Sequence, residues 1–203
     1  YEGPESVQRR QLTVTMTSPL FLAHLGNWIA ELKRLAATRP GMGALTLASA
    51  MELWRHALEY LQKEKGAKGK PLYSGQYQGV TFAMTDAISW LVASYAQIQD
   101  VVELAEKGPA HPVVGAEIKG LVRFFSDLAM IMAARAAGEV SRITTELVYG
   151  FQEPGAPENV DFAAKRSALD RSLAGARVAR ARAAEAITKV MIPLEKGPFY
   201  AVA

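Results

Sequence analysis

Apolar side chains recur every three or four positions along most of the chain, which is the spacing of an amphipathic α-helix. The first clear segment begins at Ser18 and Pro19. A hydroxyl followed by proline is typical of a helix start, because the hydroxyl caps free amides and proline needs no donor there. Pro40 and Gly41 are predicted to end this helix. Its apolar positions are Leu20, Leu22, Leu25, Trp28, Ile29, Leu32 and Leu35.

Four further segments repeat this spacing. We predict helices from about residue 44 to the loop at 66–71, from 76 to 107, from 112 to 149 and from 161 to 192. Asp161 is expected to cap the last helix and Pro193 to end it. No stretch alternates with period two for long enough to predict a strand. The sequence therefore predicts an all-α fold, an antiparallel helical bundle of about five helices.

The segment before the first predicted helix has a different composition. Residues 13–18 are Thr-Val-Thr-Met-Thr-Ser, a β-branched and polar run. Such residues favour extended backbone over helix. We therefore predict an extended connector between the N-terminal residues and the bundle.

Composition excludes several classes of chemistry. The chain has 203 residues, half of them hydrophobic, and no cysteine. Disulfides, thiolate metal sites and a cysteine nucleophile are thus excluded, and a cytoplasmic location is expected. No apolar run reaches the roughly 18–20 residues that a membrane-spanning helix needs.

Basic residues gather in the last predicted helix. They are Lys165, Arg166, Arg171, Arg177, Arg180, Arg182 and Lys189. One interpretation is contact with an anion such as CoA phosphates, nucleic acid or acidic lipid. The other is a solvated face with ion pairs to Asp170 and Glu185, or a subunit contact. We favour the second, and nucleic acid is not an expected partner because the net charge is only +3.

The histidines and tryptophans give no sign of a cofactor site. His24, His56 and His111 lack the Glu-x-x-His spacing of a carboxylate-bridged metal bundle. We therefore expect no metal site and predict that all three lie at the surface or at the edge of the core. The tryptophans, Trp28, Trp54 and Trp90, fall within apolar stripes and are predicted to belong to the core.

The candidate chemistry lies in the first residues. Glu2 is followed by Gly3, so the backbone there allows close approach of a ligand. A carboxylate in apolar surroundings can serve as a general base. On this chemistry alone, the favoured interpretation is an ordinary solvated carboxylate near a chain end.

The order of residues from Tyr1 to Arg9, Tyr-Glu-Gly-Pro-Glu-Ser-Val-Gln-Arg, resembles the signature of the acyl-CoA dehydrogenase family. The family signature is Tyr-Glu-Gly-Thr, followed two residues on by an aliphatic residue and Gln, often then Arg. Residues 19–149 also resemble, in pattern and length, the helical C-terminal extension of a bacterial subgroup that includes the 3-methylmercaptopropionyl-CoA dehydrogenases. Pro4 departs from the signature because it has neither the hydroxyl nor the N–H of the usual Thr.

The resemblance implies roles for individual residues. Glu2 matches the catalytic base, which removes the α-proton of a fatty acyl-CoA while hydride passes from the β-carbon to N5 of FAD. Gly3 matches the residue whose backbone lies against the substrate. In this chain the residues that match the family's turn against FAD are Pro4, Glu5 and Ser6. The residues that match the family's aliphatic-Gln pair, on the helix after that turn, are Val7 and Gln8.

The resemblance also implies an arrangement in which much of the enzyme precedes Tyr1, the start of the given chain. Residues 1–17 would be the end of the catalytic region, and residues 18–203 a helical extension domain. The flavin pocket would lie upstream, so this part alone is expected to be inactive. Implied partners are the acyl-CoA substrate, an electron-transfer flavoprotein as acceptor and further copies in a homo-oligomer. A non-catalytic helical domain for oligomerisation or interaction remains the alternative.

Overall fold

The computed structural model describes residues 5–195, and they form an all-α arrangement, as predicted. The helices within this range are α1 (Glu5–Thr15), α2 (Pro19–Thr38), α3 (Ala44–Lys63), α4 (Gln78–Lys107), α5 (Ile118–Tyr149), α6 (Val160–Ser172) and α7 (Ala176–Glu195). Two short 3₁₀ turns, Gly108–Ala110 and Gly115–Glu117, connect α4 to α5. The helices of the described range offer no candidate membrane span.

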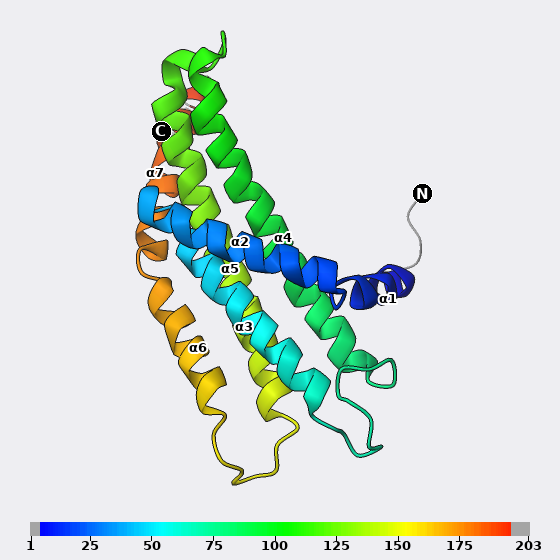
Figure 1. The fold of residues 1–203 in the computed structure, drawn as a ribbon. Coiled ribbons are helices and arrows are strands. Elements are labelled where there is room, and N and C mark those ends of the chain that lie inside the picture. The colour runs from blue at the N-terminus through cyan, green and yellow to red at the C-terminus, as the bar shows by residue number, and fades with distance from the viewer. Residues whose placement is uncertain (1–4, 196–203) are drawn as a thin grey trace.

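The long helices α4 and α5 run side by side and extend beyond α2 and α3 at the top of the view (Figure 1). Helix α3 is the central element, since it packs against α2, α4, α5 and α6. Helix α7 follows α6 and packs against α5. Helix α1 projects from the side of the bundle and contacts α4 (Figure 1).

The centre of the core is α3. Its residues Leu47, Met51, Leu53, Trp54, Ala57 and Leu61 have no exposed surface. Trp54 also satisfies its one polar group, because its Nε1 donates to the Met84 carbonyl at 3.0 Å. Burial of apolar area on nearly all sides of one helix explains how the surrounding helices share a continuous core.

Several predicted boundaries are confirmed. Ser18 caps α2 by accepting a hydrogen bond from the Phe21 amide at 3.2 Å, and Pro19 is the first helical residue. Helix α3 begins at Ala44, and α4 ends immediately before Gly108. These positions were predictable because a cap, a proline or a glycine marks each of them.

The extended connector predicted at residues 13–18 is wrong, because α1 continues to Thr15. The threonine hydroxyls donate back to carbonyls of the preceding turn, Thr13 to Arg10 at 2.7 Å and Thr15 to Gln11 at 3.1 Å. This satisfies the polar groups of β-branched residues within a helix. Only the short link before α2 lacks regular helix.

The single helix predicted at 161–192 is two helices. A turn ending at Gly175, whose φ of +89° suits glycine, separates α6 from α7. The cap is Asn159 rather than Asp161, since the Asn159 side chain accepts from the Phe162 amide at 3.1 Å. Helix α7 also continues to Glu195, past Pro193. A proline removes one helical hydrogen bond, which the backbone here tolerates.

An ion pair between a buried carboxylate and a partly exposed guanidinium attaches α7 to α5. Asp127 of α5 is 4 % exposed and accepts two hydrogen bonds from the Arg182 guanidinium, from Nε to Oδ2 at 3.0 Å and from Nη2 to Oδ1. The carboxylate raises the pKa of Arg182, so this residue stays charged. Among the α7 side chains that the structure describes, residues 176–188, the buried ones are Ala179 and Ala183.

Replacing Asp127 by Ala is therefore expected to lower the free energy of unfolding by about 2 kcal/mol, roughly 4–8 °C in melting temperature for a chain of this size. The change removes both charge-assisted hydrogen bonds of Arg182. Thermal unfolding followed by circular dichroism measures the change in melting temperature. Asp100→Ala is the matched control, because Asp100 is an exposed aspartate on α4. Equal melting temperatures for the two variants would contradict a role for the ion pair.

Candidate functional site

The predicted catalytic residues lie at the start of the chain. Glu2, Gly3 and Pro4 are outside the described residues. Glu5 and Ser6, which the resemblance assigned to a turn, form the first turn of α1 instead. An acidic residue is favourable at that position because the N-terminal end of a helix carries partial positive charge. Val7 and Gln8 lie on α1, as the resemblance implied for this pair.

Arg9 connects α1 to α4. Its Nη2 lies 2.7 Å from Glu5 Oε1 and 3.3 Å from Asp86 Oδ1, and its guanidinium lies 6.0 Å from the centre of the Phe82 ring. The Glu5 side chain is 77 % exposed, so its ion pair contributes little to stability. The arrangement fixes which side of α1 faces α4.

The other end of α1 is held more firmly. The Tyr73 hydroxyl donates to the Thr13 carbonyl at 2.9 Å, and burial raises the pKa of Tyr73, so the donor stays protonated. Met16, immediately after α1, is 2 % exposed and belongs to the core. Helix α1, on which the described part of the motif lies, is therefore attached to the bundle at its C-terminal end.

Helix α1 and the start of α2 carry exposed apolar side chains. Val7, Val14 and Leu20 are 59 %, 68 % and 70 % exposed. The four hollows that we measure in the described part of the chain are lined by other helices. None of those four gives FAD a pocket beside α1.

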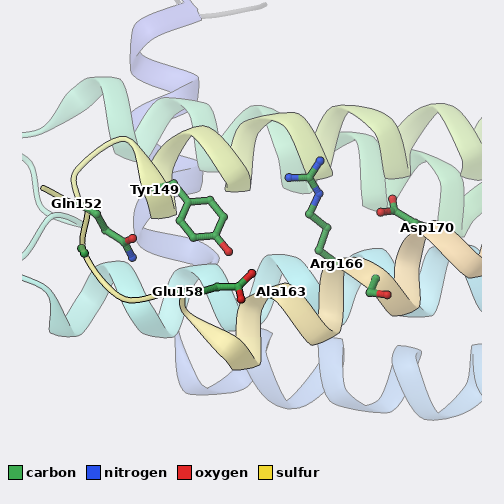
Figure 2. Close-up of a pocket in the computed structure, with 8 residues that line it drawn as sticks. Tyr149, Gln152, Glu158, Ala163, Arg166 and Asp170 are labelled. Carbon is green, nitrogen blue, oxygen red and sulfur yellow. The ribbon is translucent and has the colours of Figure 1, made fainter. Parts of the chain in front are cut away.

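The hollows of about 550 and 500 Å³ adjoin one another between α5 and α6, and both are lined by Arg166 and Asp170. Together they form what we call the α5–α6 groove. Figure 2 shows the hollow of about 550 Å³, with Tyr149 and Gln152 on one side and Glu158 and Arg166 on the other. Arg166 donates from Nη1 to the Thr145 hydroxyl at 3.1 Å and so bridges the two helices. Sequence reasoning missed this groove.

The predicted ion pairs of the basic segment are partly wrong. Within the described residues Asp170 is in no ion pair, and the partner of Arg182 is Asp127 rather than a residue of its own helix. Asp127 could have been found as a lone carboxylate in a stripe of apolar positions on α5. Its pairing with a residue 55 positions away carried no local signal.

A second polar cluster, also missed, joins α2 to α4. Glu31 accepts from the Tyr95 hydroxyl at 2.7 Å and from Gln99 Nε2 at 3.0 Å. Burial, then the neighbouring Glu31, raises the pKa of Tyr95. Trp28 stacks on Tyr95 with ring centres 4.9 Å apart. The cluster orders the contact between these helices and provides no reactive group.

The histidines lie where the sequence predicted. His24 and His111 are exposed, and His56 is half-buried beside Phe162. His56 Nε2 is buried without a hydrogen-bond partner among the described residues. In residues 5–195 no group of three or more His, Asp or Glu side chains is placed to hold a metal ion.

The tryptophans follow the prediction only in part. Trp54 is buried, whereas Trp28 and Trp90 are half-buried. The Arg135 guanidinium lies over the Trp90 ring, and its Cζ atom is 4.8 Å from the ring centre.

Comparison of the chain with protein families, with curated proteins and with solved structures finds no match.

Proposed function

We propose that the chain is the C-terminal part of an FAD-dependent acyl-CoA dehydrogenase, an oxidoreductase that introduces an α,β double bond into an acyl-CoA thioester. The observation that carries the proposal is the order of residues from Tyr1 to Arg9. The start of α1 at Glu5 supports it, since Val7 and Gln8 then lie on a helix that follows the Tyr-Glu-Gly run.

In this proposal Glu2 accepts the α-proton, Gly3 lies against the substrate, and Pro4, Glu5 and Ser6 lie nearest the flavin. FAD would supply the hydride acceptor when bound. The described residues give no pocket for it among the hollows that we measure, so the flavin site is proposed to be formed by further parts of the same protein. An electron-transfer flavoprotein is the proposed acceptor.

The decisive experiment uses the whole protein that contains this chain. If the proposal is right, the purified protein carries FAD, and a saturated acyl-CoA bleaches the flavin absorbance. Glu2→Gln should reduce the bleaching rate by about a hundredfold or more, because a general base contributes roughly 10²–10⁴ to the rate.

Glu117→Gln is the matched control, since Glu117 is an exposed glutamate of the turn before α5 and lies outside the motif. It should change the bleaching rate by less than about threefold if Glu2 is the base. A protein that neither carries nor takes up FAD would overturn the proposal, and equal effects of the two substitutions would overturn the role of Glu2.

The second candidate is a non-catalytic helical domain for oligomerisation or interaction. The open α5–α6 groove favours it, because a polar groove with a carboxylate in no ion pair suits a partner surface. The flavin experiment separates the two candidates, since this domain would bind no FAD.

A further inference from the structure

Two segments of opposite charge lie at the lower end of the bundle, where α3 and α5 end (Figure 1). Residues 63–70, at the end of α3 and in the loop after it, contain four lysines and one glutamate, and we call them the basic loop. Residues 150–161, from the end of α5 to the start of α6, contain three carboxylates and no basic residue, and we call them the acidic loop. Helices α3 and α5 pack against each other, so both loops belong to one surface.

The charges of these loops are not neutralised by ion pairs within the described part of the chain. The lysines are Lys63, Lys65, Lys68 and Lys70, and the carboxylates of the acidic loop are Glu153, Glu158 and Asp161. All seven residues are exposed, and none forms an ion pair with a described residue. The surface therefore offers a cationic and an anionic half, each able to bind the opposite charge.

Backbone hydrogen bonds hold both loops in a defined shape. In the basic loop the Gly66 amide donates to the Lys70 carbonyl at 3.0 Å, and the Leu72 amide donates to the Glu64 carbonyl at 2.8 Å. In the acidic loop the Ala156 amide donates to the Glu153 carbonyl at 3.0 Å. Because these segments are already ordered, a partner does not have to supply the free energy of ordering them.

The acidic loop also carries exposed apolar side chains. Phe151 is 49 % exposed and Val160 is 71 % exposed. A lysine can cover such a surface with its aliphatic stem while its ammonium group reaches a carboxylate or the face of an aromatic ring. A lysine-rich loop is therefore a suitable partner for the acidic loop in both charge and apolar character.

We propose that two copies of this chain join end to end through these loops in a two-fold symmetric dimer. The axis crosses this end perpendicular to the line that joins the two loops, so the basic loop of each copy faces the acidic loop of the other. The symmetry forms every contact twice. An axis along that line would instead bring like charges together. The inference uses residues 63–70 and 150–161 alone and does not depend on the proposed dehydrogenase activity.

Sedimentation velocity over a range of protein concentrations tests the proposal on the 203-residue chain, whose described helices share one continuous core. The unmodified chain should form a dimer whose dissociation constant rises with salt, because charge pairs hold it. Lys68→Glu with Lys70→Glu, or Glu153→Lys with Glu158→Lys, should raise the dissociation constant at least about tenfold, since like charges then face each other. Combining the four changes should bring the dissociation constant below that of either reversal.

Two control pairs reproduce the changes of net charge at exposed residues outside both loops. Arg34→Glu with Lys119→Glu matches the reversal of the basic loop, and Asp100→Lys with Glu117→Lys matches that of the acidic loop. Both controls should leave the dissociation constant within about threefold of the unmodified value. Far-UV circular dichroism verifies folding, and glutamine at the same loop positions gives milder variants if a reversal variant does not fold.

Several results would contradict the dimer. They are a chain that stays monomeric, a dimer that ignores either reversal, a combined variant that does not recover, and controls that act as strongly as the reversals. A monomeric chain that binds vesicles of anionic lipid through the same lysines would overturn the proposal and assign the basic loop to a membrane surface.

Discussion

Replacing Trp54 by Ala is expected to lower the free energy of unfolding by about 3–5 kcal/mol, the range found when a large aromatic side chain is removed from a packed core. Trp54 is fully buried in α3, the helix on which the surrounding helices pack. Its loss leaves a cavity that the rigid neighbours fill only partly. It also leaves the Met84 carbonyl without the 3.0 Å hydrogen bond from the indole.

Chemical denaturation followed by circular dichroism measures this effect. Trp54→Phe separates its two components, because phenylalanine keeps much of the volume and removes the indole donor. Trp90→Ala is the control at a half-buried tryptophan, and it should lower the free energy of unfolding clearly less than Trp54→Ala. A Trp54→Ala variant that loses less than the Trp90 variant would show that α3 is not the centre of the core.

Gly43→Ala is expected to cost about 3 kcal/mol, from a left-handed backbone that disfavours side chains and from overpacking. Gly43 precedes α3 with φ of +78°. A Cβ atom there would lie 2.7 Å from the Ala133 Cβ and 3.0 Å from the Met130 Cα, both on α5. Either α3 or α5 would have to move.

Gly41→Ala is a closely matched comparison, since Gly41 also has positive φ, +96°, but nothing lies within 4 Å of the position that a Cβ atom would take there. It should cost about 1 kcal/mol, from backbone strain alone. The difference between the two variants, measured by denaturation, isolates the close approach of α3 and α5. Equal costs would mean that these helices yield easily at this point.

The helical fold was predictable because its signals are local. The Ser18–Pro19 start and the stop at Gly108 each act within a few residues, and the apolar stripes of α3 and α4 need only a periodicity of about 3.6. The helicity of Thr13 and Thr15 was not predictable from propensity, since it depends on their hydroxyl bonds to the preceding turn. The break at Gly175 was concealed by alanines, which continue a helical pattern on both sides of it.

The same difference between local and long-range signals separates the candidate sites that the sequence could predict from those that it could not. The Tyr-Glu-Gly run is a contiguous signal, so sequence alone could propose Glu2 as a base. The pairing of Asp127 with Arg182, the cluster around Glu31 and the α5–α6 groove each join residues from separate helices. Tertiary packing creates them, and a periodic pattern contains no information on which helices become neighbours.

The alanine-rich contact of α7 has a consequence for the order in which the protein opens. Alanine buries little area per residue, so over residues 176–188 the apolar contribution that keeps α7 on α5 is small compared with that of leucine-rich α3. Much of the attachment then depends on the single carboxylate of Asp127. Amide hydrogens of α7 should accordingly exchange with solvent through a local opening that leaves α3, α4 and α5 folded. We thus expect α7 to separate from the bundle without global unfolding of the protein.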